Sequence, residues 1–308
     1  MRISTNVMQL NSLNSMLEQQ SKLHNTQLQL ASGKRILTPS DDPTASALSV
    51  DLNQSKQQFS QFQDNVSYAK SRLSMEETSL ATSVNILQRV RELAVQGASD
   101  NYDAVQRQNL AVEVRQRLGE ILGIGNTKDA NGDYLFAGGK GSTIPFGVKG
   151  SQVVAGLTYN TYGYDGDQVQ RQIQVGPERR IADSDHGYDA FINLRDANGA
   201  QMDVFAMIDE MAVALENDVM SSKHIEDMDN AITRMTQIRA SVGARLNALD
   251  TQETVNSDFL LRIDETMSDM HDLDYAEAIT RLNTEMAGLE SAQKAYGKVQ
   301  GLSLFNYL

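Results

Sequence analysis

Histidine is the residue type with the widest chemical repertoire in this chain, which contains four histidines and no cysteine. His24, His186, His224 and His271 are widely spaced, and none belongs to a His-x-x-x-His or His-x-x-Glu-His arrangement. A zinc site on a helix needs two such side chains one turn apart. The lack of cysteine also excludes disulfide bonds and thiolate ligands. We therefore expect no metal site, and we interpret His24 as an ordinary interface histidine.

Two glycine-containing stretches resemble ligand-binding loops but lack residues that such loops need. In the segment 138–142 (Gly-Gly-Lys-Gly-Ser), Gly141 separates the lysine from the hydroxyl residue that must follow it in a phosphate loop. The stretch that begins at Asp129 has Tyr134 at the sixth position of a calcium loop, where glycine is required, and Lys140 at the twelfth, where glutamate binds the ion. We interpret the first as a flexible corner and the second as a turn.

Neighbouring carboxylates occur at Asp41 and Asp42 and again at Asp183 and Asp185. General acid–base catalysis needs a second titratable partner within reach of the same substrate. Neither pair has such a partner in a suitable context, so we expect helix capping and solvation instead. No nucleophile motif is present either. The sequence therefore predicts no catalytic residue and no cofactor, and nothing in it supports an enzyme.

The strongest pattern is structural. Apolar positions alternate in steps of four and three residues from Leu48 to Ala94, and again from Ile225 to Met270. A repeat that averages 3.5 residues is typical of helices that pack along their whole length on a partner helix. The first such helix would be about 70 Å long at 1.5 Å per residue. We expect the two long helices to run antiparallel and to bury their apolar faces on each other within one subunit.

Four further helices are expected, and their ends carry recognisable signals. Asp42 followed by Pro43 is a suitable N-cap and first-turn pair for the first long helix. Gly33 favours the end of an N-terminal helix, and Asp103 can cap a helix that Gly125 ends. The four ranges are about 6–32, 103–124, 205–215 and 275 onward.

The middle of the chain has a shorter period. Segment 134–139 (Tyr-Leu-Phe-Ala-Gly-Gly) predicts an apolar strand, and from Pro145 to Ile192 apolar residues alternate with polar residues and glycines. The expected fold is mainly α: an elongated bundle of antiparallel helical rods with terminal helical arms and a small β-rich inserted domain. The expected parts are an N-terminal arm with its connector at 1–42, two halves of the rod at 43–145 and 196–272, an outward-facing insert at 146–195, and a C-terminal arm at 273–308.

The net charge of −13 is distributed unevenly. Residues 183–229 contain twelve acidic side chains against Arg195 and Lys223, and we expect this segment to form a solvated outer surface because like charges resist burial. Residues 1–31 carry only Arg2, Glu18 and Lys22 as charged side chains, so this arm can be buried against copies of itself without strong repulsion. No basic stripe is present, so nucleic acid is not an expected partner.

Several segments resemble proteins of the bacterial flagellin superfamily. Segment 32–36 (Ser-Gly-Lys-Arg-Ile), followed by 39–43 (Pro-Ser-Asp-Asp-Pro), resembles the N-terminal signature of that family. Segments 132–138, 242–247 and 274–278 resemble the end of its second domain and its C-terminal half. The proline-flanked connector and the two chain ends are more similar to members that join the flagellar hook to the filament than to filament subunits.

The resemblance implies a structural role in the flagellum. Copies of the chain would form a ring layer at the hook–filament junction and contact both flagellin and the other hook-associated junction protein. It also implies secretion through the flagellar type III export apparatus after binding to an export chaperone. This fits the N-terminus, which has no apolar signal segment. No run of about 18 apolar residues occurs, so membrane insertion is not expected.

Two groups of residues are predicted to carry assembly. The predicted interface consists of Leu10, Leu13, Leu17, Leu28, Leu289, Tyr296, Leu302, Leu304, Phe305 and Leu308. The predicted connector consists of Gly33, Lys34, Arg35, Pro39, Asp41, Asp42 and Pro43. We expect the arms to be disordered in the free subunit and to fold on assembly. Aspartate at residues 302, 304 and 305 should block filament attachment and leave the rods folded.

Other functions stay open on the sequence alone. A filament-forming flagellin with an unusual connector is the nearest alternative. A signalling coiled coil is another, although neither a membrane segment nor an output domain accompanies it. The β-rich insert could also bind a glycan or a host surface as an adhesin.

Overall fold

The computed structural model describes residues 2–154 and 156–305, with side chains described for residues 7–8, 10–153 and 156–298. The expected fold class, mainly helical with a small β-rich insertion, is confirmed. The helices are α1 (Arg2–Ser32), α2 (Pro43–Gly97), α3 (Ala104–Gly125), α4 (Val204–Glu216), α5 (Ser222–His271) and α6 (Tyr275–Phe305). The strands are β1 (Phe146–Val154), β2 (Leu157–Tyr164), β3 (Gln172–Gln174), β4 (Arg180–Ala182), β5 (Leu194–Arg195) and β6 (Gln201–Met202).

The predicted helix ends are confirmed where capping chemistry determines them. Asp42 accepts a hydrogen bond from the backbone N–H of Ala45 at 3.0 Å, and α2 begins at Pro43. Asp103 and Gln106 form a reciprocal capping box at the start of α3. At the end of α1, Gly33 has a φ of +68° and donates its N–H to the carbonyl of Gln29 at 2.8 Å.

The chain divides into two compact units. Unit 1 comprises Met1–Gln58 and Asp258–Leu308, so it holds α1, α6 and the adjoining ends of α2 and α5. Unit 2 comprises Phe59–Ser257, with the rest of the two long helices and every element between them.

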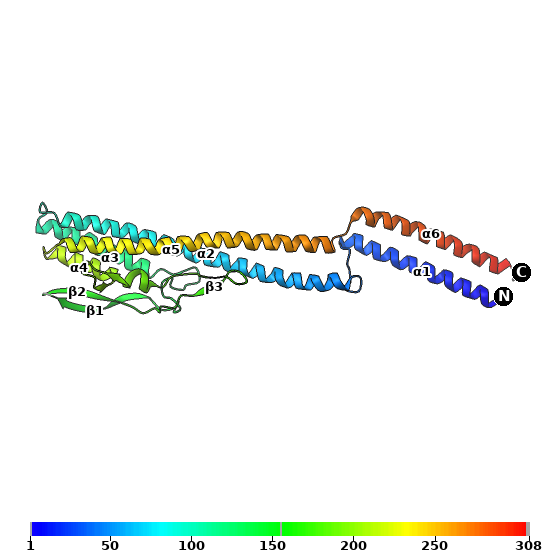
Figure 1. The fold of residues 1–308 in the computed structure, drawn as a ribbon, viewed down its shortest axis with the longest axis horizontal. Helices are drawn as coiled ribbons and strands as arrows, with labels where there is room; N and C mark the ends of the chain where they lie inside the picture. The colour runs from blue at the N-terminus through cyan, green and yellow to red at the C-terminus, as the bar shows by residue number, and fades with distance from the viewer. Residues whose placement is uncertain (1, 155, 306–308) are drawn as a thin grey trace. The chain divides into compact units, whose positions relative to one another are not determined.

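In unit 1, α1 and α6 pack side by side and antiparallel (Figure 1). The side chain of Gln19 lies close to Gly288, and Arg281 donates to the Gln29 amide oxygen at 3.5 Å. The less exposed positions of α1 recur at 4-3-4-3-4 spacing and form one face of the helix: Ser12, Met16, Gln19, Leu23, Thr26 and Leu30. Few apolar side chains of this unit are buried, among them Ile36, Ile263, Leu273 and Ala278.

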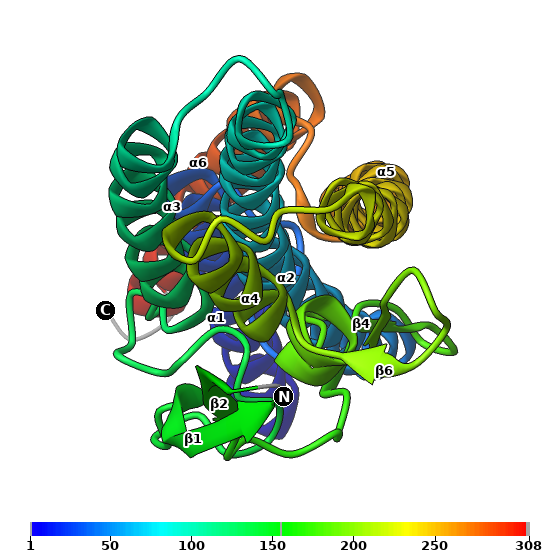
Figure 2. The same ribbon diagram turned by 90° about the vertical axis from the view of Figure 1, so that its left-hand side faces the viewer.

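In unit 2, α2 and α5 run antiparallel and are joined by ion pairs along their sides. Lys70 pairs with Asp250 at 2.6 Å, and Arg91 pairs with Asp229 at 2.5 Å. Helix α3 packs against α4, and the β1–β2 hairpin packs against α4 through β2 (Figure 2). The long repeat predicted for α2 is buried from Phe62 onward and contributes to one continuous apolar core. At its aromatic centre lie Phe136, Phe146, Phe191 and Phe205.

The β-rich insertion consists of three separate antiparallel hairpins, namely β1–β2, β3–β4 and β5–β6. A short π-helix lies between β4 and β5 at Tyr188–Ile192. The predicted strand at 134–139 is wrong: Leu135 and Phe136 are fully buried, but the segment is a series of turns with a single bridge between Lys128 and Tyr134. A short apolar run shows that a segment is buried and does not reveal its backbone conformation.

The predicted solvated surface at 183–229 is also wrong. Asp183, Asp209 and Asp227 are almost completely buried. Asp209 accepts from Arg115 at 3.0 Å and from the N–H of Asn160 at 2.8 Å, and Asp227 accepts from the N–H of Ala197 at 2.8 Å. Asp203 caps α4, and burial raises the pKa of its carboxyl to about 6. Asp183, Asp209 and Asp227 tolerate burial because other segments supply their hydrogen-bond donors or cationic partners.

No helix in the described part of the chain combines the length and the apolar character needed to cross a membrane.

Candidate assembly surface and connector

Helix α1 exposes an apolar stripe that lies next to the face that packs on α6. We define the α1 stripe as Leu10, Leu13, Leu17 and Leu28, with His24 and Ala31 in the same row. All six are exposed, and Leu10, Leu17 and Leu28 keep 58%, 55% and 44% of their surface accessible. A third face of the helix is polar, with Asn11, Ser15, Glu18, Lys22 and Asn25. The separation follows from 3.6 residues per turn, since each set recurs every three or four positions.

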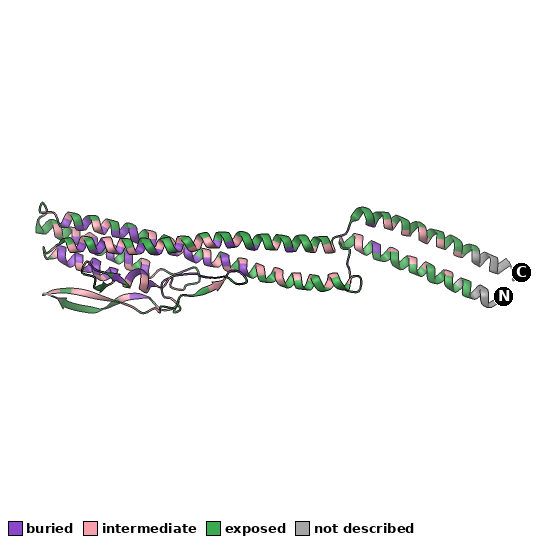
Figure 3. Cartoon of the chain, in the orientation of Figure 1, coloured by how far each residue is buried: buried purple, intermediate pink, exposed green. Residues whose placement is uncertain are grey.

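Unit 1 exposes further apolar side chains near the start of α1 and on its other helices. Figure 3 shows α1 and α6 largely exposed, whereas buried positions are concentrated in unit 2. The exposed large apolar residues outside the α1 stripe are Val7, Met8, Leu48, Val50, Phe259, Leu261, Tyr275, Ile279 and Met286. Exposed apolar surface of this extent, on a unit with few buried apolar side chains, is typical of a surface suited to association.

The predicted interface residues fall into three groups. Leu10, Leu13, Leu17 and Leu28 are exposed, as an interface requires. Leu289 and Tyr296 are half-buried, and Leu289 lines a groove of about 460 Å³ together with Leu17, Leu23 and His24 of α1. These two therefore also serve packing within unit 1. Leu302, Leu304, Phe305 and Leu308 lie outside the residues whose side chains the structure describes.

Sequence reasoning missed Phe259 and Leu261 as candidates for the same surface. They flank Leu260, the residue assigned to the apolar seam of α5, and both are exposed. Apolar residues on either side of a seam position are the signal that could have identified them, because a single helix face cannot hold three consecutive residues.

The two connectors of unit 1 pair with each other as a short antiparallel clasp. We define the clasp as residues 33–35 and 271–273. The N–H of Arg35 donates to the carbonyl of His271 at 2.7 Å, and that of Leu273 donates to the carbonyl of Gly33 at 3.0 Å. Lys34 and Asp272 lie opposite each other as a bridge pair. The clasp joins the end of α1 to the start of α6.

Side chains of the predicted connector reinforce the clasp. The Arg35 guanidinium donates to the carbonyl of Met270 at 2.9 Å and reaches Asp42 at 3.4 Å. The clasp leads into Ile36, which is buried, and then into a turn that contains Pro39. The prolines at 39 and 43 do not make the connector extended throughout, because the carboxylate of Asp41 closes a turn on residues 37 and 38.

Asp42 caps a helix as predicted, whereas Asp41 closes a turn instead of capping a helix. Asp41 accepts from the N–H groups of Thr38 at 2.8 Å and Leu37 at 2.9 Å, and these two bonds lower the pKa of its carboxyl. The bond from the N–H of Ala45 lowers the pKa of Asp42 in the same way. Backbone donors that stabilise the charged form explain both shifts.

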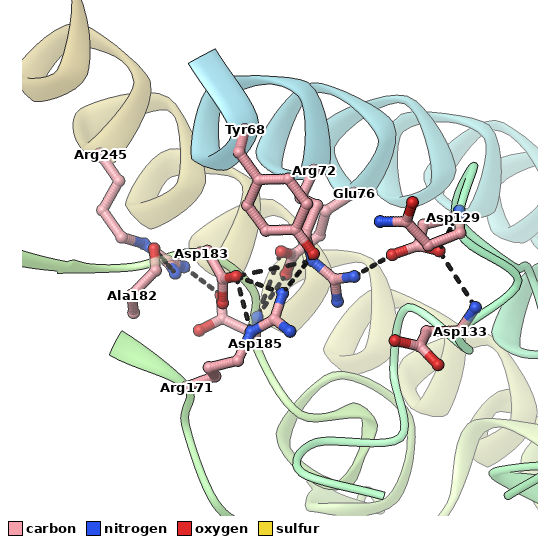
Figure 4. A network of polar contacts seen from close by, with 11 residues as sticks. Tyr68, Arg72, Glu76, Asp129, Asp133, Arg171, Ala182, Asp183, Asp185 and Arg245 are labelled. Atoms are coloured by element: carbon pink, nitrogen blue, oxygen red, sulfur yellow. Dashed lines mark hydrogen bonds and ion pairs between the residues drawn. The ribbon is translucent and has the colours of Figure 1, made fainter. Parts of the chain in front are cut away.

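The other carboxylate pair behaves differently from the prediction. Asp183 and Asp185 are neither caps nor solvated groups. Asp183 is fully buried beside Arg171 and Arg72, and Asp185 pairs with Arg245 (Figure 4). Their arginine partners come from α2, α5 and the insertion, so no local sequence signal indicates these ion pairs.

The chemistry available at the unit 1 surface is therefore association. The α1 stripe contains no Asp, Glu, Lys or Arg, and its leucines gain most from removal from water. Among the residues that the structure describes, no three His, Asp or Glu side chains are grouped as metal ligands.

Comparison with known proteins places both ends of the chain in one family. Residues 3–140 match the model for the bacterial flagellin N-terminal helical region, and residues 225–308 match the model for the bacterial flagellin C-terminal helical region. Together the two ranges cover more than two thirds of the chain.

Individual relatives differ in how much of the chain they match. Flagellar hook-associated protein 3 of Escherichia coli (strain K12) is 27% identical over 322 residues, covering 99% of both chains. Flagellin FlaB1 of Treponema pallidum (strain Nichols) is 28% identical over 221 residues, covering 72% of this chain and 68% of its own. The crystal structure of flagellar hook associated protein-3 from Legionella pneumophila superposes with a TM-score of 0.64 at 20% identity, covering 71% of this chain and 98% of that one. The last likeness concerns the fold alone.

Proposed function

The chain belongs to the bacterial flagellin family, and we propose that it is a structural subunit of the junction between the flagellar hook and the filament. In this role the protein acts as a structural subunit, and its terminal helices α1 and α6 make the contacts that hold it in the assembly.

The observation that carries an assembly role is the exposed α1 stripe. Its four leucines occupy one face of α1, and unit 1 offers few buried apolar side chains to support that helix alone. Burying apolar surface is worth about 25 cal/mol per Å², so a row of exposed leucines is a strong driving force for association. The polar face of α1 would remain in contact with water or with polar neighbours.

The extent of similarity favours the junction over the filament itself. The match to hook-associated protein 3 runs from end to end in both chains, whereas the match to flagellin FlaB1 leaves about a third of that flagellin uncovered. The connector supports the same proposal, because its segment 39–43 (Pro-Ser-Asp-Asp-Pro) resembles junction proteins more than filament subunits.

The expected partners follow from this position. The chain belongs to a family of extracellular flagellar proteins. At the junction it would form a ring of copies of itself, with another hook-associated protein on one side and flagellin on the other. Delivery would use the flagellar type III export apparatus, with a chaperone bound to the C-terminal segment beforehand.

The proposal is tested by complementing a strain that lacks the gene. We expect the deletion strain to make hooks without filaments and to shed flagellin into the medium, and the wild-type gene to restore filaments. Leu17→Asp should fail to restore them, because a buried carboxylate in the α1 stripe opposes association. Electron microscopy of cells and immunoblots of the medium give the two readouts.

Ser15→Asp is the matched control, because it adds the same charge to the polar face of the same helix and should restore filaments. Purified Leu17→Asp should unfold at the wild-type temperature, since Leu17 is exposed. Intact filaments in the deletion strain would contradict the junction role. Long filaments formed by the purified protein alone would identify a filament subunit instead.

A further inference from the structure

A polar cluster in unit 2, buried at Arg72, Glu76, Asp129 and Asp183 and open to solvent at Arg171, joins the insertion to both long helices (Figure 4). Its members come from α2, from the turn after α3, from the stretch around β3 and β4, and from α5. We define the polar cluster by its charged residues, which are Arg72, Glu76, Asp129, Arg171, Asp183, Asp185 and Arg245.

One half of the polar cluster is built around two arginines. Arg72 pairs with Asp129 and lies 3.7 Å from Asp183. Arg171 donates to Asp183 from Nε at 2.8 Å and from Nη2 at 2.5 Å, and it also donates to the Tyr68 hydroxyl at 2.8 Å. Each aspartate in this half has a guanidinium partner.

The other half is built around Glu76, which has no accessible surface. The backbone N–H of Asp185 donates to both carboxyl oxygens of Glu76, at 3.2 and 3.1 Å. The Asp185 carboxylate pairs with Arg245 of α5 and also interacts with the Glu76 carboxyl. The charged groups that face Glu76 are therefore Asp185 from the insertion and Arg245 from α5.

The charges of the polar cluster do not balance if every acid is ionised. By its definition the cluster has four carboxyl groups against three guanidinium groups, and guanidinium groups stay charged at any pH that a folded protein tolerates. Each guanidinium is paired with an aspartate, and Glu76 makes no ion pair within the described part of the chain. A buried carboxylate without its own cation is costly, and the usual relief is to bind a proton.

We propose that Glu76 carries a proton at neutral pH, that its hydroxyl donates to Asp185, and that loss of this proton loosens the insertion from α2 and α5. One proton then supplies the positive charge that the three arginines do not. The polar cluster then has no net charge. The strength with which it holds the insertion to α2 and α5 depends on pH.

The direction of the pH response follows from burial. Removal from water raises the pKa of Glu76 well above its ordinary value, and the charge of Asp185 raises it further. A carboxyl with a raised pKa in the folded state binds its proton more tightly there than in the unfolded chain. Its contribution to stability is thus complete below the ordinary glutamate pKa and is lost as the pH rises through the raised value.

Glu76→Gln in the full chain tests the proposal, because the amide is neutral at every pH and can donate to Asp185 as the protonated acid does. We expect the melting temperature of the wild-type protein to fall more steeply than that of the variant between about pH 5 and about pH 9. At the upper end the variant should be more stable by about 3 °C or more. Infrared difference spectra at neutral pH should show the carbonyl stretch of a protonated carboxylic acid in the wild-type protein.

Glu77→Gln is the matched control. Glu77 is the next residue of α2 and pairs with Arg239 at 2.6 Å on the partly exposed side of the helix. This variant should keep both the wild-type pH slope and the infrared band. Parallel slopes for the wild-type protein and Glu76→Gln would overturn the proposal. If Glu76→Gln does not fold, absence of the acid band from the wild-type protein and from Glu77→Gln at neutral pH would overturn it equally.

Discussion

Gly33 is the residue at which the chain turns from α1 into the clasp. Its φ of +68° lies in the left-handed region, which costs an ordinary residue about 1–2 kcal/mol. A Cβ atom there would also lie 2.9 Å from the Tyr275 hydroxyl oxygen at the start of α6. A single glycine therefore satisfies two constraints, one from the backbone and one from the neighbouring helix.

Gly33→Ala should lower the stability of unit 1 by more than the backbone cost alone. We expect a loss of about 2 kcal/mol, measured by urea unfolding with a probe in unit 1. Adding Tyr275→Phe, which removes the hydroxyl, should recover the part caused by the close contact. Gly132→Ala in unit 2, measured with a probe in that unit, isolates the backbone cost, because Gly132 has a φ of +88° and its Cβ would meet no neighbour within 4 Å. Equal losses at both glycines would show that the Tyr275 contact is unimportant.

Individual roles were predictable where they depend on nearby residues. Asp42, Asp103 and Gly33 act on backbone groups a few positions away, so their types and spacing were sufficient. Glu76 and Asp183 were not predictable in this way. Their partners in the polar cluster lie far along the chain and are brought close only by the packing of α2 against the insertion.

At the scale of elements, α1 has three faces with different tasks. One packs on α6, one is polar, and the α1 stripe is apolar and exposed. The helices were predictable from period and caps, because both are strong local signals over many residues. The turns at 134–139 were not, since an apolar run is compatible with any buried backbone. The sequence predicted leucines of α1 as interface residues, and the structure shows the four to be exposed, but the sequence did not indicate that Leu23 and Leu30 belong to the less exposed face.

The clasp can be tested as an element by a disulfide. Lys34 and Asp272 form the non-hydrogen-bonded pair of the clasp, in which Cα atoms are typically about 4.5 Å apart and side chains approach closely. Because the chain has no cysteine, Lys34→Cys with Asp272→Cys introduces the only two thiols. We expect oxidation to link them within one subunit and to stabilise unit 1 by about 2–4 kcal/mol.

The linkage is measured by gel mobility with and without reductant and by peptide mass. Lys34→Cys with Asp269→Cys is the control, because Asp269 is exposed one turn earlier on α5 and has no place in the clasp. Equal oxidation of both pairs would mean that residues 33–35 and 271–273 do not hold this register.

For the whole molecule, the contrast between the two units is the main feature. Unit 2 has a continuous core that includes α2, α3, α4 and α5, while unit 1 has few buried apolar side chains. Stability within a chain follows the density of buried contacts, so the two units should open independently and at different cost. The mainly helical class and the inserted β-rich part were predictable, because composition and periodicity act over long stretches.

Hydrogen exchange on the free subunit should reveal this contrast. We expect the amides of residues 1–35 and 280–308 to exchange at least about 100-fold faster than those of α2 between Val66 and Leu93, which lie beside the core of unit 2. The physical reason is that, before assembly, α1 and α6 are supported mainly by each other and by few buried apolar side chains. Comparable protection of both regions in the isolated subunit would contradict the expectation that the arms fold on assembly.

The clasp also has a consequence for the order of folding. The Arg35 side chain and the Met270 carbonyl that it contacts are 235 positions apart in the chain. Closing so long a loop is entropically expensive, so contacts of this kind form late unless an intervening domain has already shortened the distance. Folding of unit 2 brings α2 and α5 together and provides that shortening. Helix α1 packs on α6, so it cannot form this contact until nearly the entire polypeptide is present. The arms are therefore the last part of the chain to acquire structure.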